Sequence, residues 1–156
     1  MTWQEVCDDK SLQDLPYKIE LDQWGRIVMS PIDNLHGRHE ARIGILLSKH
    51  LNDGEGFFEC VIDTRLGTKV ADVAWASDAF IQRNGYETPF QRAPEICVEV
   101  ASLSNTAAER AEKIMLFLSK GALEVWICDR DGNISFHDHS GQLPQSKLAP
   151  AMPMKI

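Results

Sequence analysis

Hydrophobic and polar positions recur along this chain with two periods, which predict helices and strands. Apolar residues at spacings of three and four predict a helix over residues 36–51. A second helix is predicted from the capping box Thr106–Glu109 to Gly121. Strands are predicted over residues 17–21, where apolar and polar residues alternate, over 70–76 and 94–101, which are rich in Val, Ile and Ala, and over 26–29, 57–62, 123–128 and 134–139. This order predicts a mixed α/β (α+β) domain with helices on a central mixed sheet, preceded by an N-terminal β-hairpin.

The same pattern predicts local details and boundaries. Asn34 is the expected N-cap of the first helix. The expected buried stripe of the second helix consists of Ala111, Ile114, Met115 and Leu118. Residues 77–93 are expected to form a polar connection, and the proline-containing end an irregular tail. We therefore divide the chain into an acidic N-terminal segment (1–14), a domain (15–140) and a C-terminal tail (141–156).

Length and charge limit the classes of protein that fit. With 156 residues, 44% of them hydrophobic, the chain fits one globular domain that needs no disulfide or metal to fold. The net charge of -7 excludes a protein that binds nucleic acid or membranes through a generally basic surface. Residues 1–22 carry six acidic and two basic side chains, so -4 of this charge lies there. Local binding of nucleic acid elsewhere therefore stays open.

The sequence also carries few targeting or redox signals. The four cysteines lie tens of residues apart, which excludes zinc-ribbon and thioredoxin-like sites. The first residues lack a basic stretch followed by an apolar run, and no apolar run approaches the ~18 residues that span a bilayer. We therefore expect a cytoplasmic protein with no membrane partner, in which Cys97 and Cys128 are buried and reduced.

Two acidic residues lie inside otherwise apolar strands and suggest a site. They are Asp72, within residues 70–76, and Glu99, within residues 94–101. Burial of a carboxylate without compensation is costly, so such residues are usually paired or bound to a metal. If the strands are neighbours, the two carboxylates meet, and a hard cation such as Mg²⁺ would relieve their repulsion. The alternative is a surface ion pair at each strand end.

Other charged residues extend this candidate site. Lys113, on the helix after Glu99, would stabilise a developing negative charge or orient a water, and its alternative role is a solvated helix flank. Glu40 would add a third carboxylate from the first helix, and its alternative is an exposed helix acid. His36 and His39 could bind a metal as a pair but lack a third ligand, so we expect them to cap the helix or to support the metal ligands. His137 and His139 are expected on exposed sheet surface.

These motifs follow one another in an order that resembles the Uma-two family. The resemblance is most specific from the Glu99 strand through Lys113 and Gly121 to residues 124–129, and it covers roughly residues 15–140. Members are small, mostly bacterial proteins with a restriction-endonuclease-like fold, within the PD-(D/E)XK nuclease superfamily. The opening hairpin and the helix that begins near His36 look like that family as well.

The resemblance implies a metal-dependent endonuclease of nucleic acid, with DNA as the favoured substrate. Asp72 and Glu99 match the metal-binding acids of the superfamily, so Mg²⁺ (or Mn²⁺) is the implied cofactor. The usual lysine two residues after the glutamate is replaced here by Ala101, and Lys113 matches the helix lysine thought to take its place. Glu40 corresponds to the acid of the first helix.

Two other functions stay open at this stage. The chain would also suit a nuclease-like scaffold without cleavage, a binding or assembly module such as a homodimer. A hydrolase of another phosphodiester or of a nucleotide is the third hypothesis. Binding of Mg²⁺ or Mn²⁺, and a screen of substrates, would separate these functions.

Overall fold

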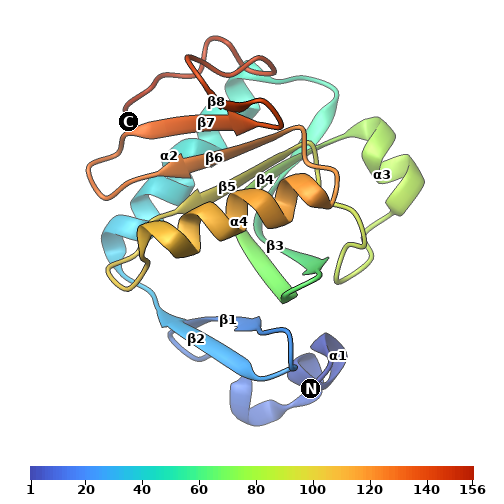
Figure 1. Ribbon diagram of the computed structural model, residues 1–156. Coiled ribbons are helices and arrows are strands. Elements are labelled where there is room, and N and C mark those ends of the chain that lie inside the picture. Colours follow the sequence, from blue (N-terminus) through green and yellow to red (C-terminus); the bar gives the residue numbers. More distant parts are fainter.

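A six-stranded sheet with the strand order β3-β4-β5-β6-β7-β8 dominates the computed structural model, which describes residues 1–156 (Figure 1). Its strands are β3 (Gly54–Thr64), β4 (Gly67–Ser77), β5 (Ile96–Val100), β6 (Glu124–Cys128), β7 (Ile134–Asp138) and β8 (Gly141–Leu143). Only β5 and β6 run parallel, because the helix between them carries the chain back across the sheet. The predicted mixed α/β architecture is confirmed.

The predicted N-terminal hairpin forms a second, separate sheet. Its strands are β1 (Tyr17–Leu21) and β2 (Ile27–Pro31), and it follows α1 (Trp3–Asp8) and a short 3-10 turn, η1 (Lys10–Leu12). Figure 1 shows the hairpin and the N-terminus together at one end of the molecule, beyond the tip of β3 and β4. Hydrogen bonds join β1 to β4: among them, the Val70 N–H donates to the Glu20 carboxylate at 2.7 Å, and Lys69 donates to the Leu21 carbonyl at 3.1 Å.

Helices cover both faces of the larger sheet. They are α2 (Asn34–His50) on one face, and α3 (Asp78–Asn84) and α4 (Ala107–Ser119) on the other. Side chains alternate along a strand, so Val98 of β5 packs with α2 while Cys97 packs with α4. The same alternation turns Glu99 towards α4. None of the helices combines the length and apolarity that a bilayer-spanning segment requires.

Three local expectations are wrong. The side chain of Asp33, and not of Asn34, caps α2. Residues 77–93 are not all loop, because Ser77 caps the short helix α3, which is too short to show apolar periodicity in the sequence. The expected irregular tail begins with β8, which pairs with β7.

The buried face of α4 also differs from the expected stripe. Ala111 and Met115 are exposed, and the other two expected members are only half-buried. Instead Lys113 and Phe117 are buried, with 9% and 0% exposure. The helix turns its lysine inward because the carboxylate of Glu99 lies there, 3.1 Å from the ammonium group. An ion pair thus replaces an apolar contact in this part of the interior.

Candidate active site

Two buried carboxylates from adjacent strands form the centre of the candidate site. Asp72 on β4 is 1% exposed, and Glu99 on β5 is 3% exposed. The ladder between the strands reaches the pair Val73–Val98 and goes no further in this direction. The N–H of Val100 donates instead to Oδ2 of Asp72 at 2.7 Å. Asp72 is thereby held against the backbone of β5, next to Glu99.

Lys18 of β1 lies between these two carboxylates. Its Nζ is 2.8 Å from Oδ1 of Asp72, and 3.2 and 3.4 Å from the two oxygens of Glu99. Burial lowers the pKa of Lys18, but the charges of Glu99 and Asp72 outweigh it and raise the pKa above its ordinary value. For the carboxyl group of Asp72, burial raises the pKa, but Lys18 and His36 outweigh this effect and hold the pKa below its ordinary value. Both groups therefore stay charged.

Lys113 and Glu20 extend the charged cluster on the other side of Glu99. Nζ of Lys113 contacts Oε1 of Glu20 and lies 3.1 Å from Oε1 of Glu99. Burial raises the pKa of Glu20, but Lys113 and Lys18 outweigh it and hold that pKa below its ordinary value. Burial and the charge of Asp72 raise the pKa of Glu99, which the two lysines only partly oppose. Three carboxylates thus share two ammonium groups.

His36 of α2 contacts the second carboxylate oxygen of Asp72, and Glu40 of the same helix contacts His36. Nε2 of His36 lies 3.4 Å from Oδ2 of Asp72, and its Nδ1 lies 3.4 Å from Oε1 of Glu40. Burial lowers the pKa of His36, but its contact with Asp72 outweighs burial and raises it. Burial and the charge of Asp72 raise the pKa of Glu40 to about 7. Glu40 therefore exchanges its proton near neutral pH.

The chemistry of these donors suits a divalent cation. His36, Glu40 and Asp72 each offer one ligand atom, and the three atoms lie within 4.8 Å of one another. They line a cavity of about 440 Å³. Carboxylate oxygens suit Mg²⁺ or Mn²⁺, and the imidazole favours a transition metal. The space between Asp72 and Glu99 instead holds the Lys18 ammonium, so an ion that bridged those two carboxylates would have to displace it.

The four residues singled out in the sequence converge. Asp72, Glu99 and Lys113 belong to one buried cluster, and Glu40 joins it through His36. The sequence indicates His36 and His39 as a metal-binding pair without a third ligand, and so favours a capping or supporting role; in the structure Glu40 and Asp72 lie beside His36 instead. His39 is buried, its Nδ1 has no hydrogen-bond partner, and its Nε2 lies near Gly132.

Lys18 and Glu20 were missed. They stand two apart on β1 and so share a face of that strand, which was the available signal. The signal was ambiguous, because alternating charged and apolar residues are also typical of a hairpin that faces water.

Comparison with known proteins agrees with this fold. The model of the Uma2 family, described as "Putative restriction endonuclease", matches residues 9–148. No curated protein sequence matches the chain. The crystal structure of a "putative nuclease belonging to DUF820" from Anabaena variabilis superposes with a TM-score of 0.74 at 16% identity, over 99% of this chain and 94% of that one. That likeness concerns the fold. The family match spans most of the sequence, and the chain therefore belongs to the Uma2 family of restriction-endonuclease-like proteins.

Proposed function

We propose that this protein is a divalent-metal-dependent endonuclease that hydrolyses phosphodiester bonds of nucleic acid, with DNA as the favoured substrate. The observation that carries the proposal is the position of Asp72. One of its oxygens contacts the Lys18 ammonium, and the other faces His36 and, beyond it, Glu40. A single buried carboxylate thus joins a cationic cluster to a set of metal-ligand donors. Membership of the Uma2 family adds independent support.

Lys18 and Lys113 supply the positive charge that phosphoryl chemistry needs. Each contacts Glu99, which holds both ammonium groups beside its own carboxylate. Fixed cations in a site that excludes water stabilise the negative charge that builds up on a phosphate under attack. Glu99 is thus a positioning residue for the two lysines as well as a candidate metal ligand.

Glu40 and His36 supply the proton transfers. With a pKa of about 7, Glu40 can accept a proton from an attacking water near neutral pH. His36 lies between Glu40 and Asp72 and orients the Glu40 carboxyl through Nδ1. A divalent cation held by Asp72 and His36, with Glu40 left free as the base, would lower the pKa of the water and offset phosphate charge.

Product analysis with defined metals tests the activity. Single-stranded DNA, duplex DNA and RNA are each incubated with the purified protein in Mg²⁺, in Mn²⁺ and in excess chelator. We expect internal cleavage with either metal and none in chelator. Cleavage that continues in chelator would contradict the metal requirement. The use of three substrates also separates DNA from RNA, and a nucleotide or small diester added as a fourth addresses other phosphodiesterases.

The second candidate function is a nuclease-like binding scaffold without cleavage. One observation favours it: the Lys18 and Lys113 ammonium groups already compensate much of the charge of Asp72 and Glu99, so these carboxylates can be buried without a metal. Calorimetric titration separates the two functions. An endonuclease should bind Mn²⁺ or Mg²⁺ at millimolar concentration or below, whereas a scaffold should show no binding heat.

A further inference from the structure

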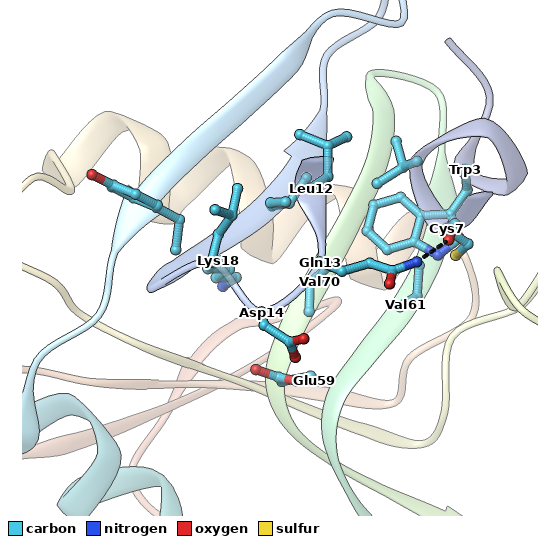
Figure 2. A pocket seen from close by; sticks show the side chains of 13 residues that line it. Trp3, Cys7, Leu12, Gln13, Asp14, Lys18, Glu59, Val61 and Val70 are labelled. Atoms are coloured by element: carbon cyan, nitrogen blue, oxygen red, sulfur yellow. Dashed lines mark hydrogen bonds between the residues drawn. The ribbon is translucent and has the colours of Figure 1, made fainter. Parts of the chain in front are cut away.

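An apolar pocket lies between the N-terminal segment and the sheet, beside the candidate active site (Figure 2). Its volume is about 340 Å³, within the roughly 300–1,000 Å³ typical of small-molecule sites. Nine of its thirteen lining residues are hydrophobic. Trp3 of α1, Val61 of β3 and Val70 of β4 are among them, and Figure 2 shows the Trp3 ring next to the side chain of Val61. The pocket therefore combines an aromatic ring with apolar side chains, which suits a ligand with a flat, largely apolar face.

The pocket adjoins the cavities of the catalytic cluster, with which it shares lining residues. Lys18 lines this pocket, the small cavity beside Glu99 and the larger cavity beside Asp72. Glu59 lines both the apolar pocket and the cavity beside Asp72. A nucleotide with its phosphate at Lys18 and Asp72 would therefore have its base within reach of the pocket.

The polar atoms of the pocket are mainly hydrogen-bond acceptors. Asp14 and Glu59 direct carboxylates to one end of it, as Figure 2 shows. The Nε2 of Gln13 donates to the Cys7 carbonyl at 3.3 Å, which leaves the amide oxygen of Gln13 as an acceptor. The ammonium of Lys18 is held by carboxylates of the catalytic cluster. The pocket thus disfavours a phosphate and favours a ligand that presents N–H donors.

We propose that this pocket binds an unstacked nucleobase of the substrate strand and prefers guanine; this deepens, and rests on, the proposed nuclease function. Stacking on Trp3 accepts any base, because every base has an aromatic face. The carboxylates of Asp14 and Glu59 select among bases by their donors. Guanine offers N1–H and its amino group side by side, a match for one carboxylate, whereas uracil and thymine offer a single N–H. Guanine therefore binds better than uracil or thymine, and better than adenine or cytosine, whose amino group stands beside a ring nitrogen that accepts hydrogen bonds.

Binding of nucleosides, measured without metal, tests the pocket independently of cleavage. Guanosine and uridine are titrated into ¹⁵N-labelled protein in chelator, and amide shifts are followed by NMR. We expect guanosine to shift the amides of Val61 and Val70, and to bind on the order of tenfold more tightly than uridine. Trp3→Ala should weaken guanosine binding by about tenfold. The control Trp24→Ala removes an exposed tryptophan outside the pocket and should leave binding unchanged.

A second pair of variants keeps the test decisive if loss of Trp3 disturbs α1. Val61→Phe fills the pocket from β3 and should abolish guanosine binding, and Val28→Phe makes the same change on exposed β2 as its control. Asp14→Asn should reduce the preference for guanosine over uridine, whereas Glu112→Gln on exposed α4 surface should not.

The possible outcomes separate the two proposals. If guanosine shifts only amides outside the pocket, or binds the wild type and Val61→Phe equally well, the proposal of a base-binding pocket is overturned. Neither result would affect the proposed nuclease function. Base binding without any cleavage would overturn the nuclease function while supporting the pocket as a base-binding site.

Discussion

The ammonium group of Lys18 lies 2.8 Å from Oδ1 of Asp72, although the two residues are 54 positions apart and belong to different sheets. This contact makes the N-terminal hairpin part of the candidate site. It also couples charge to packing, because Asp72 is 1% exposed and would otherwise be a buried, poorly compensated anion. Substitutions in the hairpin should therefore change the charge and the stability of the site on the larger sheet.

Replacement of Lys18 by methionine should destabilise the metal-free protein. The change leaves Asp72 and Glu99 buried with less positive charge, and loss of one partner of a buried pair typically costs about 3–5 kcal/mol. Urea unfolding in chelator measures the loss. Mn²⁺ should restore more stability to Lys18→Met than to the wild type, because an ion can then enter the space between the two carboxylates.

Lys49→Met is the matched control, since Lys49 is exposed on α2 and makes no ion pair. An equal free energy of unfolding for Lys18→Met and Lys49→Met would show that the bridge contributes nothing.

Replacement of Lys113 by methionine should lower the rate of cleavage on the order of 10²-fold, the usual effect of removing one group that stabilises transition-state charge. Lys113→Arg should keep part of the activity, because it preserves the charge facing Glu99 and Glu20. Single-turnover kinetics with saturating protein separate this loss from weaker binding. Equal rates for Lys113→Met and the wild type would remove the lysine from the mechanism.

Glu40 should make the stability of the metal-free protein depend on pH. Its pKa of about 7 in the folded protein exceeds the ordinary value of 4.5, so the folded state binds more protons than the unfolded state between these values. Its contribution to stability is therefore complete below about pH 4.5 and is lost as the pH rises through about 7. Glu40→Gln removes this dependence.

The expected gain of Glu40→Gln over the wild type grows from about pH 5 to about pH 8. It reaches on the order of 1–2 kcal/mol, after allowance for the partial exposure of the side chain. Denaturant unfolding across this range in chelator measures it. A constant difference between the two proteins would contradict the raised pKa.

Glu124 should anchor the C-terminal segment. This buried carboxylate accepts hydrogen bonds from the indole of Trp126 at 2.7 Å, from the Ser146 hydroxyl at 2.7 Å, and from the N–H groups of Lys147 and Leu148 at 2.7 and 3.0 Å. Glu124→Ala leaves these donors unpaired, at about 1–3 kcal/mol for each that stays buried. In Glu124→Ala, hydrogen exchange of the Lys147 and Leu148 amides should accelerate strongly. The control Glu112→Ala should not change it. Unchanged exchange would mean that other contacts hold the segment.

The sequence predicted the sheet and the two strand acids for a simple physical reason. Asp72 and Glu99 interrupt apolar strands, and a buried charge demands a partner. It did not predict Lys18, because the partner arrives from a separate sheet whose docking is decided by tertiary contacts. The inward face of α4 was missed for the same reason: Lys113 is buried by its ion pairs, a preference that hydrophobic periodicity cannot register.

The central claim is that Asp72 belongs to a metal-dependent cleavage site, and one comparison tests it most directly. The single-turnover rate of DNA cleavage in Mn²⁺ is measured for the wild type, for Asp72→Asn and for Asp63→Asn, a control on β3 outside the cluster. We predict a rate loss on the order of 10³-fold for Asp72→Asn and little change for Asp63→Asn, with both variants folded by circular dichroism. Equal cleavage by Asp72→Asn and the wild type would contradict the assignment of the site.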